Sequence, residues 1–356
     1  MDNPRTAREK GKQQLVRGGG RQDGGVKRSW GWLLLASILL TLAVPFALGG
    51  VKQFALLNRL TWWTAGLLAV LTLISWAFNA LRTQLLMGAL QQKIGFFEAA
   101  LTTISAEFAG MATPASVGLP ATYTFLFRNL GITVGEAVGL VSVIMLTDII
   151  YFGSIMSVAL LAQVWESPGL VSAKLAIAMV AVITGGAVAL LLLVENFRLI
   201  YHYISRQMAK VSWLARRRYR LARGTVHFLR AVRTVRRMSG TRLAALYFFT
   251  LGFWLPRYLV LIAVIYLAGG IIPFSYLLLV QGILNLGGQM FLMPGGGGVV
   301  DAGYAALLSP YLHREPLAFT LLVWRTYNFY WFLIVGGPIF LYKTGDAARN
   351  LLMGKK

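Results

Sequence analysis

The sequence has no cysteine among its 356 residues, and it has only three histidines and 12 acidic residues. Without cysteine there is no disulfide, no thiolate metal site and no cysteine nucleophile. The histidines, His202, His227 and His313, have no mutual helical spacing and form no HExxH pattern, so they do not indicate a zinc site. We therefore expect no metal, no cofactor and no enzymatic activity in this chain.

The shortage of acidic residues leaves a net charge of +22. The basic residues gather at the borders of apolar runs, before the first run and again in residues 198–242, a block that contains no acidic residue. This distribution is typical of the positive-inside signal of a membrane protein, with a further attraction to anionic lipid heads. We therefore expect membrane lipids as partners and no nucleic acid.

The apolar content is high, with 57% hydrophobic and 13% charged residues and a mean hydropathy of +0.65. Soluble domains are about half apolar and about a quarter charged, so the chain is predicted to be an all-α integral membrane protein. The runs at residues 30–48 and 60–81 have about the 20 residues that a bilayer-spanning helix needs. The first run has no Ala-x-Ala cleavage motif before Lys52, so it is not read as a signal peptide.

Two apolar stretches are interrupted, one at Thr113-Pro114 and one at Pro294–Gly298. Non-helical backbone is tolerated at membrane depth only where protein or a watery cavity satisfies its amides. We therefore predict two re-entrant helical hairpins in addition to six transmembrane helices. The six crossings are expected at residues 30–48, 60–81, 134–164, 171–194, 243–268 and 317–342.

The order crossing, broken hairpin, crossing occurs about residues 60–164 and again about residues 243–342, entering from opposite sides. This is the pattern of an inverted-topology repeat, in which paired breaks point to a transporter's binding site. Both termini are then cytoplasmic. The predicted organisation is a disordered basic cytoplasmic tail at 1–29, a transmembrane domain at 30–345 with a basic amphipathic cytoplasmic segment about 196–242, and a cytoplasmic tail at 346–356.

Two charges fall deep inside predicted helices, Asp148 and Arg325. A charge at the centre of a bilayer costs about 2.5–3.5 kcal/mol even on insertion scales, so these side chains are functional candidates. We expect both to face one central cavity, where Arg325 holds a head-group phosphate and Asp148 pairs with it or with a cationic head group. The alternative is a buried structural ion pair.

Three further charges need an explanation. Asp301 follows four consecutive glycines at the start of a half-helix, where it is expected to stabilise the helix. The backbone amides there could also attract a phosphate, or the glycines could simply allow close helix packing. Glu107 lies in an apolar hairpin arm and should be protonated, paired or facing water. Arg128 is expected to anchor a helix end at the interface.

Several of these residues resemble the motifs of a known membrane-protein family. Pro294–Asp301, Trp324-Arg325 and Tyr330 resemble the P-G-G-x-G-x-x-E, R and Y signature of a flippase-like membrane family that includes the membrane half of bacterial lysylphosphatidylglycerol synthases. A weaker first-half pattern is met by Thr113-Pro114, Gly118, Arg128–Ile132 and Asp148. The resemblance implies lipid translocation. The implied path residues are Thr113, Pro114, Gly118, Asp148, Pro294, Gly295, Gly296, Gly298, Asp301 and Arg325, with Glu107, Arg128 and Tyr330 as further candidates.

The sequence also departs from this pattern. Ile144-Met145 stands where many relatives have Glu-Arg, Leu119 replaces an expected acid, and Asp301 replaces the usual glutamate. Only a short tail follows Tyr342, so we expect no soluble aminoacyl-transferase domain and no lysyl transfer.

The resulting hypothesis is a lipid flippase or transporter of the bacterial inner membrane that moves an anionic, aminoacylated or polyprenyl-linked lipid between leaflets. The alternative is a non-catalytic membrane partner that scaffolds a lipid-linked glycosyltransferase or a lipid synthase. A homo-oligomer is compatible with either.

Overall fold

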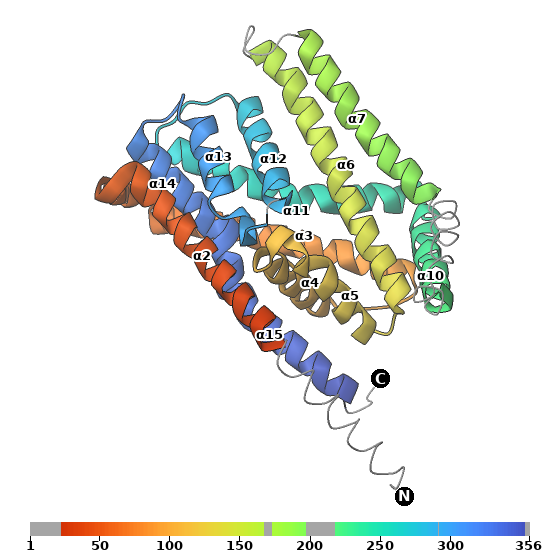
Figure 1. Cartoon of the computed structure of the whole chain (residues 1–356). Helices are drawn as coiled ribbons and strands as arrows, with labels where there is room; N and C mark the ends of the chain where they lie inside the picture. Colours follow the sequence, from red (N-terminus) through yellow and green to blue (C-terminus); the bar gives the residue numbers. More distant parts are fainter. Residues whose placement is uncertain (1–22, 167–172, 197–217, 291, 353–356) are drawn as a thin grey trace, which may run out of the picture.

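The computed structural model describes residues 23–166, 173–196, 218–290 and 292–352, and every regular element in these ranges is helical (Figure 1). The predicted all-α class is confirmed. Residues 1–22 of the predicted tail, residues 197–217 of the predicted amphipathic segment and the last four residues lie outside the described residues.

Three described helices are long and apolar enough to cross a membrane: α3 (Trp62–Ala89), α6 (Val134–Glu166) and α11 (Gly240–Leu267). They overlap three of the six predicted crossings, those at residues 60–81, 134–164 and 243–268. Ser239 is the N-cap of helix α11. Its hydroxyl accepts a hydrogen bond from the backbone amide of Arg242 at 3.4 Å. Such a cap satisfies one of the backbone donors that a helix start leaves unpaired.

Two other predicted crossings are helical but have shorter apolar stretches. Helix α2 (Asp23–Gly49) contains one at Leu34–Gly49, and helix α7 (Ala173–Glu195) contains one at Lys174–Gly186. Helix α2 leads into a 3-10 segment, η1 (Gly50–Arg59). Helix α7 runs antiparallel to α6, and the two form a hairpin that projects from one end of the molecule (Figure 1).

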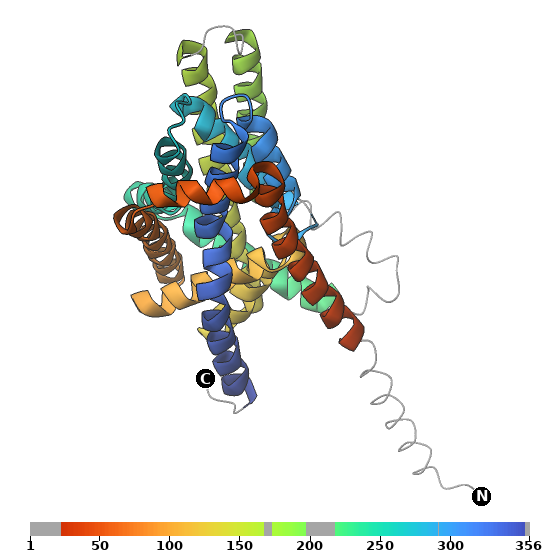
Figure 2. The same ribbon diagram turned by 90° about the vertical axis from the view of Figure 1, so that its left-hand side faces the viewer.

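The last predicted crossing is interrupted by a wider turn. Helix α14 (Arg314–Arg325) passes through a π-helical turn, η4 (Thr326–Tyr330), into α15 (Trp331–Leu352). Single π turns inside α-helices occur frequently at functional sites. The start of α2 and the end of α15 lie at the same end of the molecule (Figures 1 and 2).

The first predicted break lies where expected. Helix α4 (Phe96–Met111) leads into a 3-10 turn, η2 (Pro114–Ser116), and then into α5 (Gly118–Asn129). Ala115 and Ser116 have φ angles of 49° and 53°, in the left-handed region that costs an L-residue roughly 1–2 kcal/mol. A Cβ at Gly118 would lie 2.3 Å from a backbone carbonyl oxygen of α4, so this position requires glycine.

The second break has the same local geometry. Helix α12 (Phe274–Met290), the 3-10 turn η3 (Pro294–Gly296) and α13 (Val299–Leu308) follow one another. Gly295 and Gly296 have φ angles of 58° and 65°, so in each break a proline is followed by two left-handed residues. A Cβ at Gly295 would lie 2.0 Å from the ring of Phe329. Backbone angle and packing therefore both require glycine here.

The described part of the basic segment forms α10 (Arg218–Arg236), which packs against α6. Ala231 is buried in this contact, and a Cβ at Gly139 would lie 2.7 Å from the Ala231 Cβ. The helix therefore has a protein partner on one face instead of lying only on lipid.

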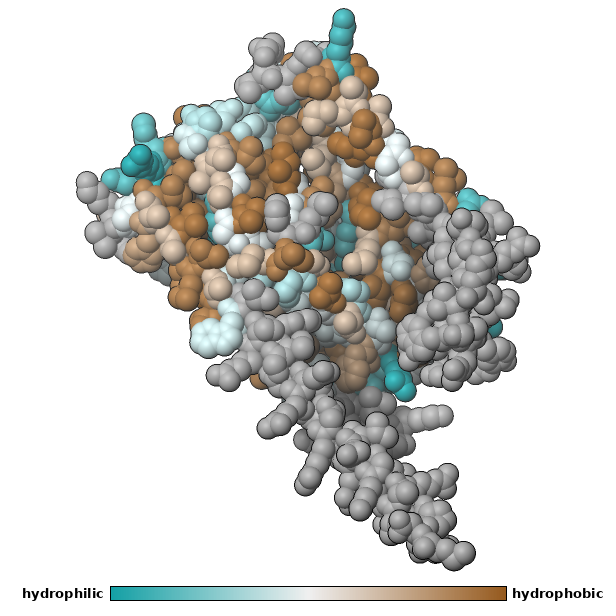
Figure 3. Space-filling view, in the orientation of Figure 1, coloured by the Kyte–Doolittle hydropathy of each residue, from teal (hydrophilic) through white to brown (hydrophobic). Residues whose placement is uncertain are grey.

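The main core lies between α3, α6, α11, α12, α13 and α14, where Tyr258, Leu261 and Tyr304 are fully buried. Much of the visible outer face is apolar (Figure 3). Trp62, Trp63 and Ile334 are each about 70% exposed, as lipid-facing side chains would be. The fold thus has a packed interior and an apolar exterior, which suits a bilayer.

Candidate functional site

The two breaks meet. Turn η2 contacts η3, and helix α12 contacts both turns. Next to them lies a cavity of about 450 Å³ with walls from both halves of the chain. The first half supplies Glu107, Ser116 and Asp148, and the second half supplies Arg257 and Arg325. The sequence elements that interrupt the helices are therefore also the elements that enclose a polar space.

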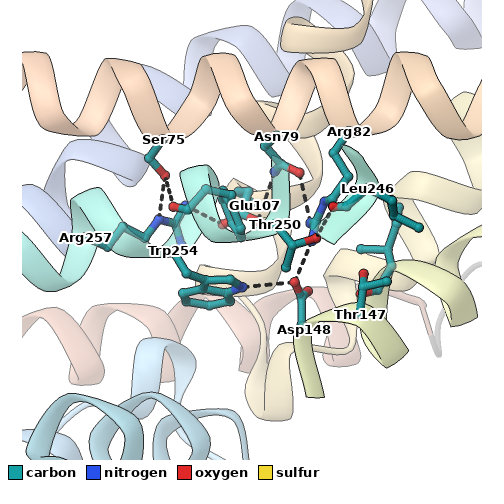
Figure 4. Close-up of polar contacts among 12 residues, drawn as sticks. Ser75, Asn79, Arg82, Glu107, Thr147, Asp148, Leu246, Thr250, Trp254 and Arg257 are labelled. Atoms are coloured by element: carbon teal, nitrogen blue, oxygen red, sulfur yellow. Dashed lines mark hydrogen bonds and ion pairs between the residues drawn. The ribbon is translucent and has the colours of Figure 1, made fainter. Parts of the chain in front are cut away.

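Asp148 is held on the cavity wall by two donors. Arg82 of α3 donates to Asp148 Oδ1 at 2.5 Å, and the indole nitrogen of Trp254 in α11 donates to the same oxygen at 2.9 Å (Figure 4). The Arg82 side chain is 1% exposed, whereas Asp148 is 20% exposed. Asp148 Oδ2 accepts no hydrogen bond from any described residue. One carboxylate oxygen is thus fixed and the other is free.

Glu107 is also paired. Arg257 Nη2 lies 3.0 Å from Glu107 Oε2, and Arg257 Nε donates to Ser75 Oγ at 3.0 Å. The guanidinium lies 4.1 Å from the ring centroid of Phe253. Aromatic faces stabilise a guanidinium where water is excluded. Of the three states that the sequence allowed for Glu107, the structure has the paired one.

Asn79 connects these two ion pairs (Figure 4). Its carbonyl oxygen accepts from Arg82 Nη2 at 2.9 Å, and its amide nitrogen lies 3.5 Å from Glu107 Oε1. The polar chain therefore extends from Arg257 through Asn79 to Asp148 and joins α3, α4, α6 and α11. Because α11 belongs to the second half of the chain, this network ties the two halves together.

A third ion pair supports the second break. Arg325 Nε donates to Asp301 Oδ1 at 2.6 Å, and Arg325 Nη1 donates to the Gly295 carbonyl at 3.0 Å. Arg325 is 4% exposed, and its Nη2 has no hydrogen-bond partner among the described residues. An unsatisfied buried donor costs free energy, about 1–3 kcal/mol or more when charged. Arg325 itself is one of the residues that line the cavity.

The start of α13 is already occupied by a carboxylate of the chain. The Gly298 amide donates to Asp301 Oδ2 at 2.9 Å, so Asp301 caps its own helix as predicted. A Cβ at Gly297 would lie 2.0 Å from Ser37 Oγ of α2. The geometry thus favours close packing for the glycine run over a phosphate bound to the helix start.

The cavity is electrically balanced and partly apolar. Its charged side chains are two acids, Glu107 and Asp148, and two bases, Arg257 and Arg325. Between them lie apolar side chains from six helices, Met111, Leu119, Phe152, Trp254, Leu284 and Val300. Among the described residues no group of three histidine, aspartate or glutamate side chains could hold a metal ion. The site is suited to an amphipathic ligand that carries charge.

Four of the residues singled out from the sequence line this cavity: Glu107, Asp148, Gly295 and Arg325. Asp148 and Arg325 do not pair with each other, since each has a different partner. The other predicted residues have supporting positions. Those in the breaks are Thr113, Pro114, Gly118, Pro294, Gly296 and Gly298, and those outside the cavity wall are Asp301, Arg128 and Tyr330.

Two of these outer residues have defined environments. Tyr330 shares a hydrogen bond of 2.6 Å with Thr41 of α2, so it links the π turn to the first helix. Arg128 is exposed in the last turn of α5, consistent with an interfacial anchor.

Sequence reasoning missed Arg82, Arg257, Asn79 and Trp254. Arg82 directly follows the predicted crossing at residues 60–81, and the structure shows it buried in an ion pair with Asp148. A signal was present in α3, where Ser75, Asn79 and Arg82 recur three or four residues apart in an apolar run. That spacing places polar side chains on one helix face, which must then face protein or a cavity.

A comparison with known families supports the resemblance seen in the motifs. The family model described as "Lysylphosphatidylglycerol synthase TM region" matches residues 29–336, which include every cavity residue named above. None of the curated proteins matches the chain.

Proposed function

The chain belongs to the lysylphosphatidylglycerol synthase transmembrane-region family, and from this membership and the cavity we propose that it is a lipid flippase. The observation that carries the proposal is that two charged residues on one cavity wall each have a polar atom without a partner among the described residues. Arg325 Nη2 is a buried donor without a partner, and Asp148 Oδ2 is an acceptor without one among the described residues. A ligand that supplies an anion and a cation would satisfy both.

The proposed cargo is a phospholipid whose head carries a phosphate and an ammonium group, as an aminoacylated phospholipid does. The phosphate binds Arg325, because guanidinium groups match phosphate geometry. The ammonium group binds Asp148, which Arg82 and Trp254 hold in position. A volume of about 450 Å³ is within the usual range for small-ligand sites and would accept a head group while the tails remain outside.

The proposed transport pathway uses the two breaks. We place the protein in a bacterial inner membrane with six crossings, two re-entrant hairpins and both termini cytoplasmic, because this arrangement puts the basic clusters on one side. The halves then form an inverted repeat around the cavity. Rocking of one half against the other, across the contacts of Arg257 with Glu107 and of Trp254 with Asp148, would open the cavity to each leaflet in turn. The chain then acts as a transporter and not as an enzyme.

Vesicle transport tests the proposal. Purified protein is reconstituted with head-labelled lipid, and the rate of exchange between leaflets is measured by chemical quenching of the outer label. We expect Arg325→Gln to slow exchange by at least about tenfold, the loss of one charged hydrogen bond. Arg314→Gln, which removes an exposed charge at the start of α14, is the matched control.

A second variant separates binding from folding. Asp148→Asn keeps an oxygen for Arg82 and Trp254 but removes the negative charge, so exchange of an aminoacylated phospholipid should slow more than exchange of phosphatidylglycerol. Equal rates for the wild type, Arg325→Gln and Asp148→Asn with both lipids would refute the flippase assignment.

The second candidate function, a scaffold for a lipid synthase or glycosyltransferase, is favoured by one observation. Arg230, Arg233 and Arg237 are exposed on and just after α10, where they could contact an acidic partner. Replacing all three with glutamine distinguishes the two functions. A scaffold would lose its partner in a pull-down, whereas a flippase would retain its exchange rate in vesicles.

A further inference from the structure

A second cleft, of about 570 Å³, lies between the C-terminal part of α3 and the N-terminal part of α11. Its walls are made by Leu81 and Leu85 of α3 and by Phe249 of α11. At its mouth are Lys93, from the link after α3, and Arg242, from the first turn of α11. Among the described residues it shares no lining residue with the central cavity, so it is a separate site.

The two cations at the mouth are not neutralised by the described part of the chain. Lys93 and Arg242 are exposed, and neither side chain forms an ion pair with a described residue. No acidic residue is among those that line the cleft. This contrasts with the buried arginines of the central cavity, each of which has a carboxylate partner. The mouth therefore carries an uncompensated positive charge.

The position of Lys93 is fixed by a contact within the cleft wall. The Gln84 amide nitrogen donates to the Ile94 carbonyl at 2.9 Å, which ties the link after α3 back to the helix. Lys93 is adjacent to this anchored residue in sequence, so its backbone is held beside the cleft. The cationic mouth is thus part of a defined wall and does not depend on a free loop.

The side chains that line the cleft determine which kind of anion can bind there. Besides the two cations, the cleft is lined by four apolar side chains, Leu81, Leu85, Ile94 and Phe249, and by Gln84, Gly88 and Gln92. The four apolar side chains form no hydrogen bond with a small hydrated anion. They would contact an acyl chain, whose burial against apolar side chains is favourable in the head-group region. An amphipathic anion therefore complements both the charge at the mouth and the apolar walls.

We propose that this cleft binds an anionic phospholipid, with its phosphate between Lys93 and Arg242 and an acyl chain along Leu81 and Phe249. Helix α10, which carries the exposed Arg230 and Arg233, contacts α3, and anionic lipids attract such basic residues. The site holds a resident lipid at the protein surface, and its existence does not depend on the proposed transport function.

Lipid retention measured by native mass spectrometry tests the site. Full-length protein is equilibrated in micelles that contain equal amounts of phosphatidylglycerol and phosphatidylcholine. We expect the wild type to retain phosphatidylglycerol preferentially, and Lys93→Gln/Arg242→Gln to lower this preference by about 30-fold, the combined effect of two basic residues near a membrane surface. Lys174→Gln/Arg314→Gln, which removes two exposed charges at other helix starts, should retain it.

Three outcomes would overturn the proposal. The first is unchanged retention in the Lys93→Gln/Arg242→Gln protein, and the second is an equal loss in the Lys174→Gln/Arg314→Gln control. The third is displacement of the lipid by millimolar inorganic phosphate, which would indicate a site for a free anion. The vesicle exchange rate of the Lys93→Gln/Arg242→Gln protein is measured in parallel, and it bears only on transport.

Discussion

Neutralising one member of the Arg257–Glu107 pair is expected to destabilise the protein. Neutralising both members is expected to cost less than the sum of the two single changes. Arg257 is 6% exposed and Glu107 is 7% exposed, and the guanidinium also donates to Ser75 and lies over Phe253. After Arg257→Met the carboxylate would remain buried, and its remaining hydrogen-bond donor among the described residues would be the amide of Asn79 at 3.5 Å. An unpaired buried charge costs about 3–5 kcal/mol, so the free energy of unfolding should fall by about that amount.

The double variant tests whether the destabilisation comes from an unpaired buried charge. Glu107→Gln/Arg257→Met leaves no unpaired charge, so its destabilisation should be smaller than the sum of the two single effects by about 0.5–3 kcal/mol. The assay is thermal unfolding in detergent, followed by the fluorescence of the ten tryptophans. Single variants that lower the midpoint by several degrees, with partial recovery in the double variant, would agree with a buried pair.

The chain contains a matched pair for comparison. Lys343 lies 2.5 Å from Glu98, but the Glu98 side chain is 37% exposed. Exposed ion pairs contribute about 0–1 kcal/mol, so Glu98→Gln should scarcely change the unfolding midpoint. If Arg257→Met and Glu107→Gln were no more destabilising than Glu98→Gln, the buried network described here would be refuted.

Three other predictions concern the breaks and the network. Gly118→Ala should lower the yield of folded protein, because its Cβ would lie 2.3 Å from a carbonyl oxygen of α4. The control Gly66→Ala has open space around its Cβ and should express normally. Equal yields of the two proteins by size-exclusion chromatography would contradict this. Ser116→Gly should raise the free energy of unfolding by about 1 kcal/mol because φ is 53°, and a lower thermal midpoint would show that the left-handed angle is wrong. Trp254→Phe should slow lipid exchange by releasing Asp148, and an unchanged rate would show that the indole does not position the carboxylate.

The local features of the fold were predictable because they depend on local chemistry. Pro114 and Pro294 interrupt helices because proline restricts its own backbone and lacks an amide donor, and the glycines after Pro294 add backbone freedom; both breaks lie where the sequence predicted them. The first break follows directly on α4, which ends at Met111. Helix α5 begins only at Gly118, because left-handed angles at Ala115 and Ser116 delay the helix.

The pairing of the charges was not predictable, because it depends on contacts between distant helices. Asp148 and Arg325 stood out as charges in apolar runs, but their partners lie 66 and 24 residues away along the chain. Arg82 lies near the end of an apolar run, so it resembled a border residue. Arg257 is in the middle of a span and could have been found by the same rule that identified Asp148.

The central claim, that the lipid head occupies the cavity between the breaks, can be tested directly because the chain has no cysteine. Ser116→Cys places a single thiol on the cavity wall, and Ser309→Cys places one at an exposed helix end outside the cavity. The rate at which a small charged thiol reagent modifies each protein is measured with and without lipid cargo, together with lipid exchange after modification. We predict that cargo protects Cys at position 116 and that its modification stops exchange, whereas position 309 shows neither effect. Full exchange by a protein completely modified at position 116 would contradict the account.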